Sequence, residues 1–164
     1  MGWLAVIALA LGLGLAARSW LICPVRVVGT SMEPTLRDGE LVLVTKFDYL
    51  RAKPARGDVV LCRLPGRAGE YVKRVIGLPG ETVRIASGQV YIDGAPLEEP
   101  YAAPAERDYA RAPGEDEYLV MGDNRPASYD SREDDVGSLN SGDFLGRARR
   151  VLWPRERFFA GVAD

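Results

Sequence analysis

Short hydrophobic runs separated by turn-forming residues occupy most of the chain after residue 25 and constrain its fold most strongly. The runs are rich in Val, Ile, Leu and Tyr, and Gly, Pro or Asp separates each run from the next. Helical periodicity is scarce there, whereas short strands bounded by turns produce this pattern. We therefore predict a mostly β domain. The expected strands are residues 25–28, 40–46, 58–63, 70–76, 82–86, 89–92, 117–121 and 148–153.

One stretch differs in composition from its surroundings. Residues 93–117 are rich in Ala, Glu, Asp and Arg and contain several prolines. Turn formers and polar residues favour exposed backbone, so we expect a surface insertion. With 164 residues, the chain has room for one compact domain and a short anchor, but hardly for two independent domains.

The N-terminal segment is apolar. Residues 3–17 carry no charge, and a helix continuing past Arg18 would reach the roughly 20 residues that cross a bilayer. A cleaved signal peptide is the competing interpretation, because small residues, Ala16 and Ala17, end the apolar run. A secretory leader normally carries a Lys or Arg before its apolar run, and this chain has neither there. We therefore expect a transmembrane anchor over residues 1–22, followed by the β domain over residues 23–164.

Charge and cysteine content exclude two kinds of partner. The formal net charge is −2, and the charges are interspersed without a long basic block, which argues against nucleic-acid binding. The two cysteines, Cys23 and Cys62, are not in a C-x-x-C pair, and the chain has no histidine. A nitrogen-and-sulfur metal site cannot be assembled from this set, so we expect buried thiols, no metal and no organic cofactor.

The absence of histidine also limits nucleophilic catalysis. A reactive serine would need another base, and lysine is the known substitute. Ser31 lies in residues 29–36, which read Gly-Thr-Ser-Met-Glu-Pro-Thr-Leu, and Lys73 lies in a predicted strand. A lysine accepts a proton only when neutral, and burial lowers its pKa. Strand alternation places Lys73 on one face with Tyr71 and Val75, with Arg74 pointing away. Taken alone, however, such residues are usually a loop serine and a solvated strand lysine.

Several segments in a fixed order change that assessment. They are residues 29–36, 57–61, 71–81, 122–132 and 146–154. Together with the N-terminal anchor, these segments resemble the bacterial type I signal peptidases, membrane-bound Ser-Lys proteases that remove signal peptides from exported preproteins. The resemblance covers residues 29 to 154 in motif order, with only residues 93–117 unmatched.

The resemblance implies a role for each matched residue. Ser31 would be the nucleophile, and Lys73 the general base that later returns a proton to the leaving amine. Ser128 matches a second serine that orients the lysine. The matched support residues form an expected ion pair of Asp130 and Arg132, with Arg74 as an extension.

The oxyanion site departs from one branch of the family. The backbone N–H of Ser31 is the expected donor to the developing oxyanion. Gly29 stands where that branch has a serine whose hydroxyl joins the site, so this chain would rely on backbone amides or on Thr30. By resemblance, Met32 would shield the catalytic pair from water.

The resemblance also implies the substrate and the location. The substrate would be an exported preprotein with small residues at the first and third positions before the cut, bound as an added strand. The domain would lie on the outer face of the plasma membrane. The positive-inside rule favours the opposite orientation, because Arg18 and Arg26 follow the anchor, although a long folded domain can override that rule. The expected pocket residues are Val27, Val28, Leu61 and Ile76, and the expected bilayer-contacting aromatics are Trp20, Trp153, Phe158 and Phe159.

Three alternatives remain open at this point. A self-cleaving repressor shares Ser-Lys chemistry but carries a DNA-binding domain where this chain has an apolar segment. A conjugation-type processing peptidase is poorly separated by sequence. A catalytically silent, membrane-tethered module that only binds exported peptides would need neither Ser31 nor Lys73.

Overall fold

The computed structural model describes residues 2–3, 6–7, 12, 22–50, 52–158 and 160–162. The predicted anchor over residues 1–22 therefore lies almost entirely outside the described residues, as do Trp20 and Phe159. Within the described part of the chain, no helix has both the length and the apolar character needed to span a membrane.

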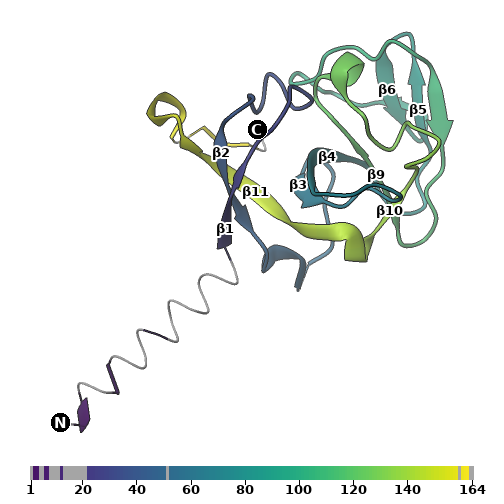
Figure 1. Cartoon of the computed structure of the whole chain (residues 1–164). Coiled ribbons are helices and arrows are strands. Elements are labelled where there is room, and N and C mark those ends of the chain that lie inside the picture. Colours follow the sequence, from purple (N-terminus) through teal and green to yellow (C-terminus); the bar gives the residue numbers. More distant parts are fainter. Residues whose placement is uncertain are drawn as a thin grey trace.

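The prediction of a mostly β domain is confirmed. Seven antiparallel strands form the larger sheet, in the order β1-β2-β11-β3-β4-β9-β10, and Figure 1 shows how strongly this sheet curls. Its strands are β1 (Ile22–Arg26), β2 (Leu41–Thr45), β3 (Val59–Cys62), β4 (Tyr71–Gly77), β9 (Glu117–Met121), β10 (Leu139–Asn140) and β11 (Phe144–Trp153). The described part of the chain also contains four short 3₁₀ helices. Three lie in connections between strands, η1 (Asp48–Leu50), η2 (Arg125–Ala127) and η3 (Ser141–Asp143), and η4 (Arg155–Arg157) follows β11.

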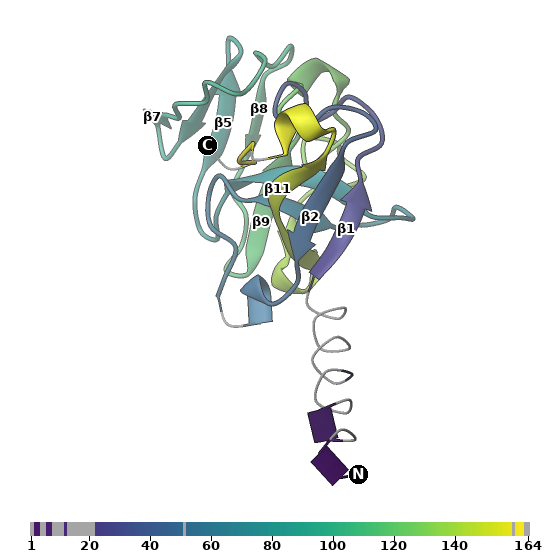
Figure 2. The ribbon, with the colours of Figure 1, turned by 90° about the vertical axis from the view of Figure 1, so that its left-hand side faces the viewer.

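A four-stranded sheet packs against β4 and β9, on the far side of the molecule from β1 and β2 (Figures 1 and 2). Its strands, in order, are β7 (Ala95–Pro96), β6 (Gln89–Ile92), β5 (Val83–Ala86) and β8 (Tyr109–Arg111). Residues 93–117 thus supply β7 and β8, which were not among the predicted strands. With two and three residues, they are too short to show a repeating hydrophobic pattern.

The long strand β11 produces much of the curl. It pairs with β3 near its start and with β2 along the rest, and its register shifts at three places. Such bulges bend a strand and increase its twist. Gly146 of β11 lies close to β2, and an added Cβ there would come within 2.7 Å of the Thr45 carbonyl oxygen. Because the sheet curls, the segment that leaves β1 and the start of β4 line the same groove.

Candidate active site

Ser31 lies in a turn of residues 30–36, called the nucleophile turn below. The side chains of Met32 and Leu36 in this turn are both buried in the core cluster beneath β2 and β11. Within the turn, the Leu36 amide donates to the Met32 carbonyl oxygen at 2.8 Å, and the Glu33 amide donates to that of Thr30 at 3.1 Å. Ser31 itself remains partly exposed at the rim. This arrangement fixes the backbone of a serine whose hydroxyl stays accessible.

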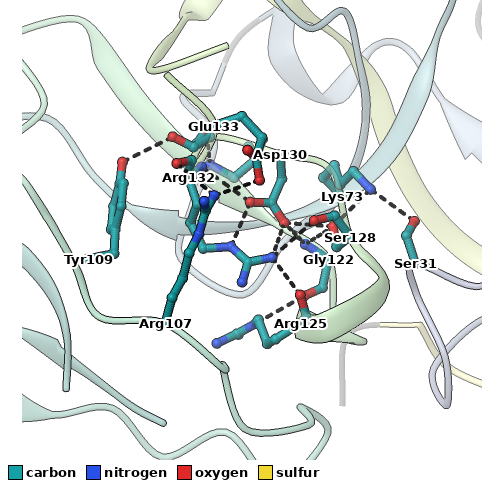
Figure 3. A network of polar contacts seen from close by, with 12 residues as sticks. Ser31, Lys73, Arg107, Tyr109, Gly122, Arg125, Ser128, Asp130, Arg132 and Glu133 are labelled. Carbon is teal, nitrogen blue, oxygen red and sulfur yellow. Dashed lines mark hydrogen bonds and ion pairs between the residues drawn. The ribbon is translucent and has the colours of Figure 1, made fainter. Parts of the chain in front are cut away.

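Lys73 reaches Ser31 from β4. It lies opposite Val60 of β3 and is only 2% exposed. Its Nζ donates to Ser31 Oγ at 2.9 Å and to Ser128 Oγ at 3.1 Å (Figure 3). Burial is the largest influence on this amine and lowers the pKa of Lys73, although the negative charge of Asp130 opposes the shift. The amine therefore loses its proton more readily than an ordinary lysine does.

Residues 122–133, called the base loop below, hold Ser128 in place. Ser128 Oγ accepts a hydrogen bond from the Gly122 amide at 3.1 Å and donates one to Asp130 Oδ2 at 2.6 Å. Arg132 donates to both oxygens of Asp130, at 2.8 and 2.9 Å, and both side chains are buried. Burial alone would raise the pKa of Asp130, but the hydrogen bonds and charge of Arg132 outweigh it, so the pKa lies below its usual range. Asp130 therefore stays ionised and accepts a hydrogen bond from the Ser128 hydroxyl.

Arg74 has a different partner from the one expected. It points away from Lys73, as strand alternation predicts, but it does not extend the Asp130–Arg132 pair. Its guanidinium instead donates to Asp123 at 2.9 and 2.7 Å, and neither side chain is exposed. Thr35 Oγ1 also donates to Asp123, at 2.5 Å. The expected extension is therefore wrong, because the face of β4 opposite Lys73 is closed by the start of the base loop.

Asn124 joins the base loop directly to the nucleophile turn. Its amide donates to the Ser31 carbonyl oxygen at 3.0 Å, and its side-chain Nδ2 donates to the Thr30 carbonyl oxygen at 3.2 Å. Sequence reasoning singled out neither Asn124 nor Asp123, although both lie in the matched segment of residues 122–132. Their position inside that segment is the signal that could have identified them.

A groove of about 460 Å³ begins at Ser31 and Lys73 and runs between the end of β1 and the start of β4. The predicted pocket residues Val27, Val28 and Leu61 line it, together with Met32. Ile76 does not, and its assignment to the pocket is wrong. It is fully buried against the smaller sheet, which covers that end of β4.

The backbone amide N–H of Ser31 has no hydrogen-bond acceptor among the residues that the structure describes. Gly29 has a φ of +91°, a conformation that residues with a Cβ rarely adopt. The Gly29 amide donates to Asp38 Oδ1 at 2.7 Å. Thr30 is exposed. The backbone amide of Ser31 is therefore free to bind an oxygen anion at the groove.

The two cysteines are both free thiols. Cys62 is fully buried, and burial raises its pKa to about 12; Cys23 is only partly buried, contrary to expectation. In the described part of the chain, no group of three or more His, Cys, Asp or Glu residues is placed to hold a metal ion.

Comparison with known proteins gives consistent matches. A family profile described as "Signal peptidase, peptidase S26" matches residues 1–153. The chain is 38% identical over 165 residues to a signal peptidase I of Bacillus licheniformis, an alignment that covers 93% of this chain and 88% of the relative. It is 36% identical over 162 residues to a signal peptidase I of Leptolyngbya laminosa, covering 92% and 78%.

A solved structure supports the same assignment. The crystal structure of a signal peptidase I from Enterococcus faecalis V583 superposes with a TM-score of 0.52 at 31% sequence identity, covering 58% of this chain and 97% of that one. The family profile, the relatives and this fold agree. The chain therefore belongs to the signal peptidase I family of S26 serine peptidases, which are hydrolases.

Proposed function

We propose that this protein is a membrane-anchored endopeptidase that removes signal peptides from exported preproteins, with Ser31 as nucleophile and Lys73 as general base. The single observation that supports this most is the 2.9 Å contact between Lys73 Nζ and Ser31 Oγ at the end of an apolar groove. This distance is within the range required for direct proton transfer.

Lys73 activates the nucleophile when its amine is neutral. Ser31 Oγ attacks the scissile carbonyl carbon while its proton passes to Lys73 Nζ. The resulting ammonium then donates that proton to the leaving amine, which frees the mature protein and leaves an ester on Ser31. Water, deprotonated by the same lysine, hydrolyses the ester and releases the signal peptide. Ser128 accepts a hydrogen bond from Lys73 throughout and keeps the amine directed at Ser31.

The oxyanion is stabilised by the Ser31 backbone amide. Its N–H has no acceptor among the described residues and lies beside the attacking oxygen. A preorganised amide of this kind stabilises the negative charge that develops in the transition state without further reorganisation.

The groove selects extended chains with small side chains. Its two sides are backbone segments, residues 25–28 and 69–73, and an extended peptide can pair with such segments as an added strand. Val27, Met32 and Leu61 line the same groove as Ser31. Alanine fits this apolar space, and larger side chains clash with it, which gives selectivity for Ala-x-Ala sites.

The membrane brings the enzyme to its substrates. Residues 1–22 are proposed to anchor the chain in the plasma membrane, with the β domain on the extracytoplasmic side, where signal peptides emerge. Trp153 is 54% exposed and Phe158 is 43% exposed near the C-terminus. Exposed aromatic side chains partition into the interfacial region of a bilayer.

The test is cleavage of a preprotein carrying an Ala-x-Ala site by the full chain in detergent. Ser31→Ala and Lys73→Ala should each reduce cleavage to background, while Lys53→Ala, which changes an exposed lysine, should leave it unchanged. Substantial activity in Lys73→Ala would contradict the proposed mechanism. Wild-type chain that binds the preprotein without cutting it would instead identify a peptide-binding module.

A further inference from the structure

The base loop is held from outside by a segment that the sequence indicates only as a surface insertion. Residues 99–109, called the brace segment below, run along the side of the base loop facing away from Ser31, where Figure 3 shows Arg107 and Tyr109. The first contact is an ion pair. The Glu99 carboxylate accepts hydrogen bonds from Arg125 at 3.1 and 2.5 Å, and the side chains of Arg125 and Glu99 are 1% and 7% exposed.

A chain of hydrogen bonds links Arg125 to the catalytic lysine. Its Nε donates to the Gly122 carbonyl oxygen at 2.9 Å. The amide of Gly122 in turn donates to Ser128 Oγ, which accepts the hydrogen bond from Lys73. One residue, Gly122, therefore separates the buried ion pair from the serine that orients the base.

The other end of the brace segment holds the far side of the loop. The Tyr109 hydroxyl donates to the Ser131 carbonyl oxygen at 3.0 Å, and Arg107 Nη2 donates to that of Arg132 at 3.2 Å. These carbonyls belong to the two residues that follow Asp130, and one of them, Arg132, holds the Asp130 carboxylate. Tyr109 is itself anchored, because β8 pairs with β5 and places Tyr109 opposite Ile85.

The middle of the brace segment contacts the buried Arg74–Asp123 pair. The Tyr101 ring lies 3.7 Å from the Arg74 guanidinium, and the Ala103 amide donates to the Asp123 carbonyl oxygen at 2.9 Å. Pro100 and Pro104 fall within the same segment. Proline restricts the unfolded chain, so ordering this segment costs less conformational entropy than ordering a flexible loop.

We propose that the brace segment, carried by the smaller sheet, is a positioning element for the general base, with Glu99 and Tyr109 as its positioning residues. It keeps the base loop in the one arrangement in which Ser128 directs the Lys73 amine at Ser31. This inference rests on the proposed function of the Ser31–Lys73 pair. Small displacements of catalytic groups reduce rates steeply, so the brace acts on turnover more than on substrate binding.

The test compares conservative brace variants with matched controls. Tyr109→Phe removes one hydroxyl without changing charge. Its control is Tyr91→Phe in β6, where the ring stacks on Arg84 instead of contacting the loop. Glu99→Gln removes one carboxylate, and its control is Glu98→Gln, which changes an exposed neighbour. For each variant, kcat, KM, the pH dependence of kcat and the thermal midpoint are measured with the Ala-x-Ala preprotein.

We expect kcat to fall about fivefold in Tyr109→Phe and about tenfold or more in Glu99→Gln, as for loss of a neutral and a charged hydrogen bond. KM should stay unchanged, because the brace segment contributes no residue to the groove. In Tyr109→Phe, the rising limb of kcat should move to higher pH, because a looser loop admits water to Lys73 and burial is what lowers its pKa.

A lower thermal midpoint with wild-type kcat and pH dependence in both variants would make the brace merely structural and overturn the inference. Failure of the proposed function looks different. In that case Lys73→Ala retains activity in the otherwise wild-type chain, whatever Tyr109→Phe does.

Discussion

At the scale of single residues, the burial of Lys73 has opposite effects on reactivity and stability. Burial disfavours the charged form of an amine, so a larger fraction of it is neutral near neutral pH and able to accept a proton. For the same reason, the buried amine destabilises the fold while it is protonated. The folded state binds its proton more weakly than the unfolded state does. Stability should therefore rise with pH between the lowered folded pKa and the unfolded pKa, which is about 10.4.

Lys73→Met should accordingly raise the thermal midpoint at neutral pH. The expected gain is about 2–4 °C for each kcal/mol of relieved charge burial in a domain of this size. The gain should shrink as pH rises toward the unfolded pKa of lysine and should stay constant above it. Calorimetry across this range measures the effect, with Lys53→Met as the control for an exposed lysine. A variant less stable than wild type at neutral pH would contradict the assigned direction of the pKa shift.

The position of Gly122 leaves no room for a side chain. An added Cβ would lie 2.6 Å from Ser128 Cβ and would collide with the Ser31 carbonyl oxygen. Gly122→Ala should therefore reduce kcat by about 100-fold, as a displacement near 1 Å does. Gly142→Ala is the matched control, since nothing lies within 4 Å of its added Cβ. Equal activity in both variants would show that the base loop tolerates displacement.

At the scale of elements, the Arg74–Asp123 pair joins β4 to the base loop and the nucleophile turn. Removing one partner of a fully buried pair leaves an uncompensated charge, so Arg74→Met should lower the unfolding free energy by about 3–5 kcal/mol. Urea titration provides the measurement. The exposed Arg67–Asp135 pair is the control, and Arg67→Met should produce little change because solvent screens that pair.

The double variant Arg74→Met with Asp123→Leu separates the stability lost by burying an unpaired charge from the stability lost through altered packing. It should recover part of the lost stability, because no unpaired charge remains. A double variant as unstable as the sum of the single variants would indicate that the two side chains act independently.

Strands that contain several apolar residues were predictable from the sequence, and very short strands were not. β4 and β9 carry enough Val, Ile and Leu to identify them from sequence. β7, β8 and β10 have two or three residues each, and pairing with a neighbouring strand decides their conformation. The partner of Arg74 was unpredictable for a related reason, since Asp123 approaches it only after β4 and β9 pair.

At the scale of the whole molecule, the curled sheet brings together segments that are far apart in sequence. Ser31 follows β1, Lys73 lies 42 positions further along in β4, and Ser128 lies 55 positions beyond Lys73. The order of matched segments singled out these three residues. It could not establish their contact, because the contact depends on the curl of the sheet, and the bulges of β11 that contribute to this curl leave no clear pattern in the sequence.

The two sheets support different parts of the site. The larger sheet carries the groove, Ser31 and Lys73, whereas the smaller sheet carries the brace segment that contacts the base loop. Composition alone assigned residues 93–117 to the surface, because proline-rich polar sequence has the same appearance in a free loop and in a segment fixed by buried ion pairs.

The pH dependence of kcat/KM for the wild-type chain tests the central claim most directly. With the Ala-x-Ala preprotein, activity between pH 6 and about pH 10 should rise through an apparent pKa below the ordinary lysine value of about 10.4, as the burial of Lys73 requires. A rising limb at the ordinary lysine value, or one that persists in Lys73→Ala, would contradict a neutral Lys73 acting as the base for Ser31.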